Sequence, residues 1–356
     1  MSEPTEPEIL FDRRGAAGII TLNRPRALNA LTLAMIRQLR DKLDAWRDDA
    51  SVTRVIMTAA GGRAFSAGGD LREIYDLGRA GRQAQALHFF REEYQLNAII
   101  KRYPKPYIAL IDGIVMGGGV GISVHGSHRI AGERCQFAMP EVGIGFFPDV
   151  GGTWFLPRLA GEIGTYCALT CERLAMADAV SAGVATHHVP AARHPELLDG
   201  LCGAVPVDAI IAAFSQPHGA GMMGEGMTFA RRAAIDRLFA GAAVEDILAG
   251  LEAETGPEAE WAARSAAGMR AKAPLSLKIA LAQMRRGAAW SFAECMQAEF
   301  RIVSRVLLGH DFYEGVRAVI IDKDNQPHWQ PNRLEDVSAA EVERHFAAIA
   351  EELVVA

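Results

Sequence analysis

Short apolar runs alternate along the first two-thirds of the chain with segments whose apolar residues recur every three or four positions. The short runs predict β-strands, and they lie at 18–25, 54–62, 106–113, 128–141 and 183–190. The spacing of three and four predicts amphipathic helices. One such helix follows Thr32, a residue suited to an N-cap, and a second is predicted from about 84 to 101. Strands that alternate with helices in this way favour an α/β fold.

The pattern changes after about residue 205. A glycine-rich stretch at 212–230 predicts a loop. From 229 onward the sequence predicts successive helices rich in Ala, Leu and Arg, and Pro274 can begin one of them. We therefore predict two domains: residues 1–205 as an α/β core, and residues 206–356 as a mostly helical C-terminal region.

Composition excludes several classes of partner. The 37 basic and 43 acidic residues give a formal net charge of −6, and no long basic run occurs, which disfavours nucleic acid and anionic membranes. No apolar stretch predicts a membrane span. The N-terminus is acidic and polar, unlike a signal or transit peptide. The five cysteines are odd in number and form no C-x-x-C pair, so we expect reduced thiols in a cytoplasmic protein.

Two glycine-rich turns each follow an apolar strand. FSAGGD (65–70) leads into a predicted helix in which Asp70 and Glu73 occupy the positions of a capping box, and VMGGGVG (115–121) follows the strand at 106–113. Backbone N–H groups at such turns can hold a phosphate or stabilise an oxyanion. The alternative is a tight turn in which only glycine fits. The longer turn completes neither a dinucleotide fingerprint nor a P-loop motif.

Two acids, Glu141 and Asp149, lie eight residues apart in MPEVGIGFFPDVGG (139–152), which is otherwise apolar and punctuated by glycine and proline. Acids are rarely buried unless they are paired or used. Together with two oxyanion-binding turns, an acid pair supplies the parts for enolate or tetrahedral-intermediate chemistry. Glu93 follows Arg91 and Glu92 on a predicted helix, so a solvated run of charges is an alternative to a functional role there.

The glycine turns and the acid-bearing stretch, in this order and separation, resemble the signature turns of the enoyl-CoA hydratase/isomerase (crotonase) superfamily. Within it, the chain resembles the 3-hydroxyisobutyryl-CoA hydrolases through FFREEYQLN (89–97), VHGSHRIA (124–131), FPDVGGTWFLPRL (147–159) and GHDFYEGVRAVIIDKD (309–324). The resemblance covers the chain apart from a weaker zone between about 205 and 265. It implies a crotonase-like spiral of ββα units with a helical C-terminal region.

The resemblance also implies an activity: an acyl-CoA thioester is hydrolysed to a free hydroxy acid and CoA, a step of valine degradation. It implies that the N–H groups of Gly69 and Gly118 hold the thioester oxygen. Glu141 is implied to be the catalytic carboxylate with Asp149 as its partner, and Glu93 to contact the hydroxyl of the acyl group. Gly118, Glu93 and both catalytic acids are thereby implied to bind substrate. Coenzyme A is part of the substrate, and no metal or other cofactor is implied.

One departure separates this chain from the hydratases of the superfamily. They carry a second glutamate shortly after the glycine triplet, where this chain has Gly121. Hydration needs an acid and a base on either side of the attacking water. We therefore favour the thioester hydrolase and keep an enoyl-CoA hydratase or isomerase as the alternative function. A non-catalytic CoA- or RNA-binding relative is a third hypothesis. The intact acids and the negative net charge argue against it. The roles of Glu141 as nucleophile or as general base, and a homo-oligomeric state, stay open.

Overall fold

The computed structural model describes residues 6–216 and 230–355. The chain forms two compact units, each assembled from separate segments. Unit 1 comprises Met1–Gly69, Leu96–Phe137 and Leu174–Gly226, and unit 2 comprises Asp70–Gln95, Ala138–Arg173 and Met227–Ala356. The domain boundary predicted near 205 lies inside unit 1. Most of the predicted glycine-rich loop, residues 217–229, lies outside the described residues.

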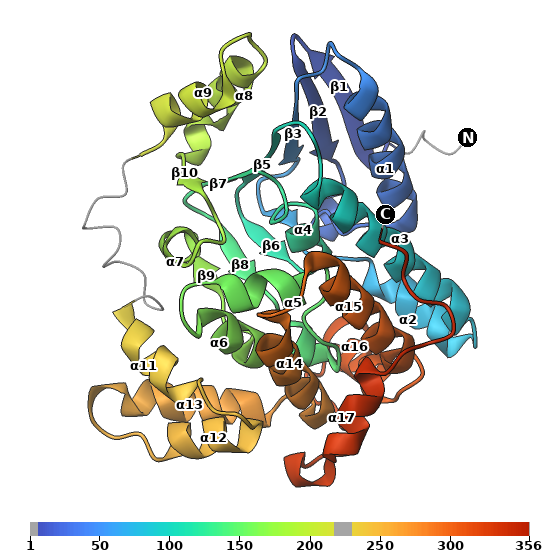
Figure 1. Cartoon of the computed structure of the whole chain (residues 1–356), viewed down its shortest axis with the longest axis vertical. Coiled ribbons are helices and arrows are strands. Elements are labelled where there is room, and N and C mark those ends of the chain that lie inside the picture. Colours follow the sequence, from blue (N-terminus) through green and yellow to red (C-terminus); the bar gives the residue numbers. More distant parts are fainter. Residues whose placement is uncertain (1–5, 217–229, 356) are drawn as a thin grey trace. The chain divides into compact units, whose positions relative to one another are not determined.

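The described residues of unit 1 contain a larger and a smaller β-sheet (Figure 1). The larger sheet has the order β1-β2-β3-β5-β7-β10 and the smaller one β4-β6-β8-β9. In the larger sheet only β1 runs antiparallel to its neighbour. The strands are β1 (Ile9–Arg14), β2 (Ala17–Leu22), β3 (Arg54–Ala59), β4 (Ala64–Ser66), β5 (Tyr107–Ile111), β6 (Ile114–Met116), β7 (His128–Ala131), β8 (Gln136–Ala138), β9 (Leu174–Ala175) and β10 (His187–His188).

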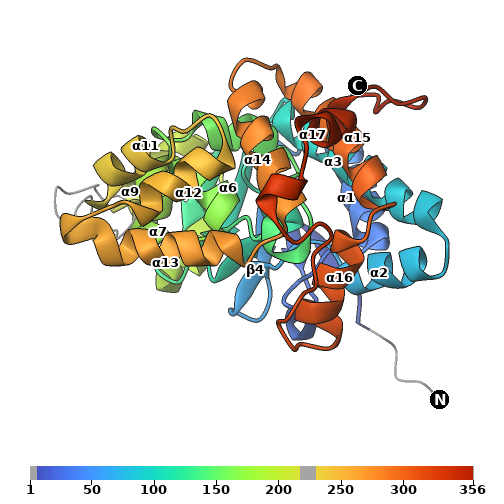
Figure 2. The ribbon, with the colours of Figure 1, turned by 90° about the horizontal axis from the view of Figure 1, so that it is seen from below.

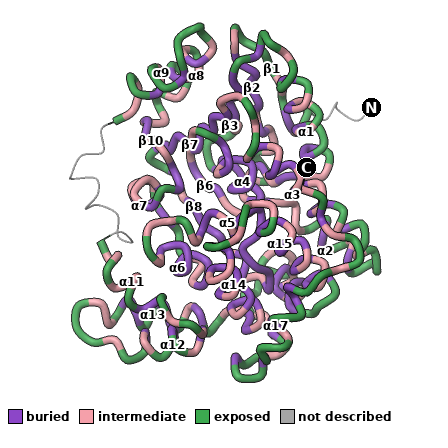
Figure 3. Tube along the Cα trace, in the orientation of Figure 1, coloured by how far each residue is buried: buried purple, intermediate pink, exposed green. Residues whose placement is uncertain are grey.

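Successive strands alternate between the two sheets. β3, β5 and β7 belong to the larger sheet, and β4, β6 and β8, which follow them directly along the chain, belong to the smaller one. A helix follows β4 and another follows β6. This repeated strand–strand–helix order is the predicted spiral of ββα units, so the predicted fold class is confirmed. β5 is buried at every residue (Figure 3), as its almost entirely apolar sequence predicts.

The described residues of unit 1 also form helices. They are α1 (Leu33–Asp48), the last part of α3 (Gln83–Lys101), α4 (Gly118–Gly121), α7 (Met176–Ala182), α8 (His194–Leu201) and α9 (Val207–Phe214). Thr32 caps α1 as predicted, because its extended backbone lets the side chain accept the N–H of Met35 at 3.2 Å. Leu197 of α8 and Ile211 of α9 pack against Ile108 of the sheet in one buried apolar cluster.

Unit 2 is mostly helical over its described residues. Its helices are α2 (Leu71–Arg79), the first part of α3 (Gln83–Lys101), α5 (Gly152–Phe155), α6 (Ile163–Thr170), α11 (Arg232–Leu238), α12 (Val244–Glu252), α13 (Ala259–Arg270), α14 (Pro274–Gly287), α15 (Phe292–Val306), α16 (Asp311–Val316) and α17 (Ala339–Phe346). Pro274 begins α14, as predicted. α6, α11 and α13 lie side by side within unit 2 (Figure 2). Ring contacts join them through Tyr166 of α6, Phe239 directly after α11, and Trp261 of α13. The predicted helical C-terminal region is therefore confirmed.

The predicted capping box at the start of α2 is wrong. Asp70 does occupy the N-cap position, but its side chain makes no capping hydrogen bond. Its ψ is 79°, whereas the capping residue Thr32 has ψ 160°. An N-cap side chain reaches the N–H of the first turn from an extended backbone, and Asp70 does not have that conformation.

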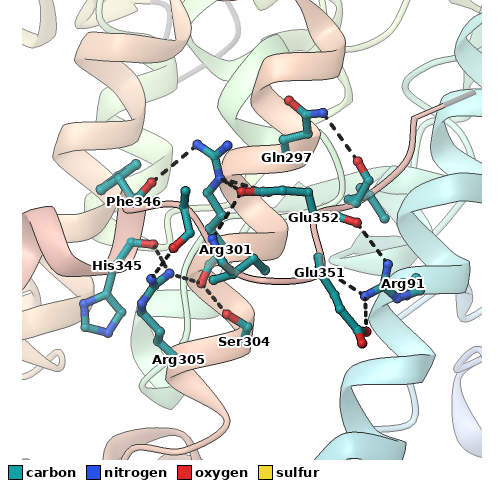
Figure 4. Close-up of polar contacts among 12 residues, drawn as sticks. Arg91, Gln297, Arg301, Ser304, Arg305, His345, Phe346, Glu351 and Glu352 are labelled. Atoms are coloured by element: carbon teal, nitrogen blue, oxygen red, sulfur yellow. Dashed lines mark hydrogen bonds and ion pairs between the residues drawn. The ribbon is translucent and has the colours of Figure 1, made fainter.

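The C-terminal segment 347–355 is tied to both α15 and α3 within unit 2 (Figure 4). Arg301 of α15 donates to both carboxylate oxygens of Glu352, at 2.9 and 3.0 Å. Arg91 of α3 donates to the backbone carbonyls of Glu351 and Glu352, at 3.3 and 3.2 Å. Leu353, the next residue of the segment, is buried. The segment therefore joins two helices that are remote in sequence.

Among the described residues, no helix combines the length and the apolar character needed to cross a membrane.

Candidate active site

The two predicted oxyanion turns meet within unit 1. β4 and β6 are parallel neighbours, so the turns that follow them emerge at the same edge of the smaller sheet. A Cβ placed on Gly68 would lie 3.5 Å from the backbone nitrogen of Gly118. Gly68 has φ 109° and Gly117 has φ 46°, a region that favours glycine. Backbone conformation thus favours glycine at these two positions, and close approach requires it at Gly119, where a Cβ would lie 2.6 Å from the carbonyl oxygen of Ser66.

The N–H groups of Gly69 and Gly118 are both available as donors. Neither donates a backbone hydrogen bond to another residue in the part of the chain that the structure describes. Gly118 is the first residue of α4, and the first N–H groups of a helix have no partner within it. α4 is only four residues long and ends at Gly121.

The three predicted acids all lie in unit 2 and are all buried. Glu93 lies on α3, and Glu141 begins a short 3-10 turn, Glu141–Ile144. Their exposed fractions are 2% for Glu93, 5% for Glu141 and 4% for Asp149. The solvated-charge interpretation of Glu93 is therefore wrong. Leu96 and Tyr94 on the same helix are buried as well, so this part of α3 faces the interior.

All three acids have raised pKa values, and the charge of one of them contributes to this shift in the other two. Burial and the charge of Asp149 raise the pKa of Glu141 and of Glu93 well above their usual values. Burial also raises the pKa of Asp149, to about 7, although the hydroxyl of Tyr94 opposes this by donating to Asp149 Oδ2 at 2.9 Å. No Lys, Arg or His forms an ion pair with these acids among the residues described. A carboxylate so placed is a strong base once it is ionised.

Two carboxylate oxygens in this group lack a partner. Glu93 Oε1 and Glu141 Oε2 are buried without a hydrogen-bond partner in the described structure. Buried polar atoms are nearly always hydrogen-bonded, and exceptions often mark a functional site. These oxygens are free to accept hydrogen bonds from a substrate or a water molecule.

Two residues that contact or influence these acids were not predicted from the sequence: Tyr94 and Glu299. Tyr94 follows Glu93 directly and is fully buried, yet nothing in its sequence distinguishes it from a core aromatic residue. Glu299 of α15 is also fully buried, and the charge of Asp149 contributes to raising its pKa to about 8, after burial itself. The sequence does contain a sign of Glu299. Cys295 and Val303, four positions away on each side, are apolar and buried, so Glu299 interrupts an apolar helix face.

The predicted site residues thus form two groups. Gly69 and Gly118 lie in unit 1, and Glu93, Glu141 and Asp149 lie in unit 2. No group of three or more His, Cys, Asp and Glu side chains able to hold a metal ion occurs among the described residues. All five cysteines are free thiols.

A family model described as enoyl-CoA hydratase/isomerase matches residues 17–346, which include every predicted site residue. The chain belongs to this family. A 3-hydroxyisobutyryl-CoA hydrolase, mitochondrial, from Danio rerio is 44% identical over 356 residues, covering 99% of this chain and 92% of the relative. The family resemblance stated from the motifs is therefore confirmed.

Two solved structures of enoyl-CoA hydratase/isomerase relatives match the whole fold. A carnitinyl-CoA dehydratase from Mycobacterium thermoresistibile is 40% identical with a TM-score of 0.92, covering 98% of this chain and 99% of its own. An enoyl-CoA hydratase from Rhodobacter sphaeroides 2.4.1 is 39% identical with a TM-score of 0.89, covering 98% of this chain and 100% of its own. The titles of these family members name reactions other than thioester hydrolysis.

Proposed function

We propose that this protein hydrolyses the thioester of 3-hydroxyisobutyryl-CoA, or of a similar short 3-hydroxyacyl-CoA, to the free hydroxy acid and CoA. The observation that carries the chemistry is the burial of Glu93, Glu141 and Asp149 in one group without a basic partner. The near full-length match to a protein named for this substrate supports the choice of acyl group.

The glycine turns bind the thioester oxygen in this proposal. The N–H groups of Gly69 and Gly118 are unused donors, and the turns that carry them are in contact. Donors held in place before the reaction stabilise negative charge as it develops on the carbonyl oxygen, and losing one such donor typically slows turnover ~10²–10³-fold. Coenzyme A enters as part of the substrate, and water is the only other reactant.

Glu141 is the catalytic carboxylate. In one route it attacks the thioester carbonyl and expels the CoA thiolate, and water then hydrolyses the resulting anhydride. In the other route it takes a proton from the water that attacks the carbonyl. The pKa of Glu141, raised by burial and by Asp149, makes its ionised form more basic and suits either role. Asp149, held by Tyr94, orients the water or the leaving group.

Glu93 supplies substrate selectivity. Its buried and unpartnered Oε1 can accept a hydrogen bond from the 3-hydroxyl of the acyl group. A buried polar atom left without a partner is unfavourable, so a site built around it disfavours an acyl chain that lacks the hydroxyl.

Hydration of an enoyl-CoA is the second candidate, because a solved relative is titled an enoyl-CoA hydratase. Gly121 argues against it, since no carboxylate is available at that position to pair with Glu141. A non-catalytic CoA- or RNA-binding role is disfavoured by the intact acids and the net charge of −6.

One assay separates these functions. Release of free CoA is followed with a thiol reagent for 3-hydroxyisobutyryl-, 3-hydroxypropionyl- and crotonyl-CoA, and hydration of crotonyl-CoA is followed by the loss of enoyl absorbance. We expect CoA release from the two 3-hydroxyacyl thioesters. Hydration of crotonyl-CoA at a rate equal to thioester cleavage would overturn the hydrolase assignment.

We further propose a cytoplasmic location and a role in valine degradation. The free cysteines support a reducing compartment, although the Danio rerio relative carries the word mitochondrial in its name. Fractionation of cells with detection of the tagged protein tests the location. Accumulation of 3-hydroxyisobutyryl-CoA on valine after deletion tests the role.

A further inference from the structure

We propose that Glu299, assisted by Gln283, is a positioning residue that holds the turn carrying Asp149 in its reactive conformation. This inference rests on the proposed function, because Asp149 is given its role there. It assigns a purpose to two buried polar side chains of the C-terminal helices that the mechanism itself does not use.

Hydrogen bonds from two helices converge on the turn at 148–153. Glu299 of α15 accepts the backbone N–H of Gly151 through Oε2 at 2.8 Å and that of Thr153 through Oε1 at 2.9 Å. Gln283 of α14 donates from Nε2 to the carbonyl of Pro148 at 2.9 Å and to the Thr153 hydroxyl at 2.7 Å. The backbone is thus fixed on both sides of Asp149.

The turn needs such support because its backbone is strained. Val150, the residue after Asp149, has φ 50°, and Gly151 has φ 86°. A β-branched residue at positive φ is a genuine outlier. Strained residues persist only where their surroundings fix them, and they gather at active sites. Without Glu299 and Gln283, the peptide after Asp149 can relax and turn its carboxylate away from Tyr94.

Capping of the short helix α5 alone does not explain a glutamate at this place. Burying a carboxylate without a cation is unfavourable, and Glu299 is fully buried, as are Gln283 and Thr153. A neutral side chain such as Ser or Asn could accept the same N–H groups at a smaller desolvation penalty. Glu299 accepts two N–H groups with its two oxygens. This fixes the orientation of the turn and also caps the start of α5.

The test compares four variants and one control variant with the parent by CoA release per folded molecule. Glu299→Gln replaces one accepting oxygen by a donor, and Gln283→Met removes the donor while keeping the volume. Asp149→Asn alone and combined with Glu299→Gln completes a double-mutant cycle. Glu294→Gln on the same helix is the matched control, because within the described part of the chain its side chain bonds to Ser291 alone, at the exposed start of α15. Amide hydrogen exchange of Gly151 and Thr153 is measured in each variant.

We expect Glu299→Gln and Gln283→Met to lower kcat about 10- to 100-fold with KM little changed, as for a displaced catalytic group. We expect faster exchange at Gly151 and Thr153, and a double mutant no slower than Asp149→Asn alone. Glu294→Gln should lower only stability.

Several results would overturn the proposal. One is a folded Glu299→Gln or Gln283→Met protein with kcat within twofold of the parent. Another is unchanged amide exchange in Glu299→Gln. A third is an additional rate loss of the same factor in the Asp149→Asn background, because Glu299 then acts independently of Asp149. If the parent protein releases no CoA from any of the three thioesters, the proposed function fails. The exchange of the Gly151 and Thr153 amides is measured without substrate, so it still reports whether Glu299 and Gln283 hold the turn.

Discussion

Buried acids without counter-ions are the defining feature of this protein at the scale of single residues. Each pKa unit by which burial disfavours a carboxylate corresponds to ~1.4 kcal/mol, and Glu93, Glu141, Asp149 and Glu299 all have raised pKa values. Such a group lowers the stability of the fold when it is ionised. In the proposed function Glu93, Glu141 and Asp149 act on a bound thioester, and Glu299 holds the turn that carries Asp149.

Glu141→Gln tests the catalytic acid. The substitution keeps volume and hydrogen-bonding shape but removes both the nucleophile and the base, so turnover should fall at least ~10²-fold. CoA release and melting temperature are measured together, with the exposed Glu172→Gln as control. A well-folded Glu141→Gln protein that hydrolyses at nearly the parent rate contradicts the mechanism.

Glu93→Ala tests selectivity for the hydroxyl. We expect kcat/KM to fall more for 3-hydroxyacyl-CoAs than for acyl-CoAs that lack the hydroxyl, because the lost partner serves only the former. Glu92→Ala is the matched control, since Glu92 forms an ion pair with His88 on the same helix. Equal losses on both kinds of substrate would remove Glu93 from the acyl site.

At the scale of secondary-structure elements, the second unit depends on contacts between helices that are remote in sequence. α3 carries Glu93 and Tyr94, α15 carries Glu299, and the C-terminal segment 347–355 is bonded to both helices. The guanidinium of Arg91 also lies 4.4 Å from the ring centre of Phe300 on α15. The last residues of the chain therefore contribute to the packing of two helices that bear site residues.

Arg301→Ala should release this segment. Arg301 binds Glu352 through two hydrogen bonds and is only 29% exposed, so we expect a loss of about 1 kcal/mol of stability and faster amide exchange over 347–355. Glu352→Gln should act in the same direction. Arg264→Ala, which breaks an exposed pair with Glu260 on α13, is the control and should change neither quantity. Unaltered exchange in Arg301→Ala would show that Arg91 and Leu353 hold the segment without Arg301.

At the scale of the whole molecule, the acid group links stability to pH. Asp149 has a pKa of about 7 and Glu299 of about 8, both higher than in an unfolded chain. The folded state therefore binds protons more tightly than the unfolded state. The resulting stabilisation is present below the unfolded pKa of ~4 and is lost as the pH rises through 7 and 8.

The melting temperature should accordingly fall as the pH rises from 5 to 8. Carboxyls with lowered pKa values, such as Glu314 at about 2, titrate below this window and do not interfere. Asp149→Asn removes one ionisable group, so its melting temperature should exceed that of the parent by more at pH 8 than at pH 5. Thermal unfolding of both proteins at both pH values measures this. A gain over the parent that is no larger at pH 8 than at pH 5 would contradict the assignment.

Local patterns in the sequence were sufficient for much of the fold and part of the site. Hydrophobic periodicity and turn residues act over a few positions, so β2, β3, β5, β7, β8 and β10, α1 with its cap at Thr32, and the helical C-terminal region could be predicted. The short strands β4, β6 and β9, and the edge strand β1, were not predicted. The glycine turns could be found because positive φ and close approach require glycine there. Glu141 and Asp149 stood out because acids are unusual in an apolar stretch.

Only the tertiary structure decided which groups meet. Glu299 lies 148 residues from Gly151, and Tyr94 lies 55 residues from Asp149, so no local pattern relates them. The failed cap at Asp70 likewise depends on a backbone angle that residue type alone does not specify. Residue type and spacing determined which segments fold and which side chains are unusual. The pairing of those side chains was decided by long-range packing, because hydrogen bonds of this kind depend on distance in space.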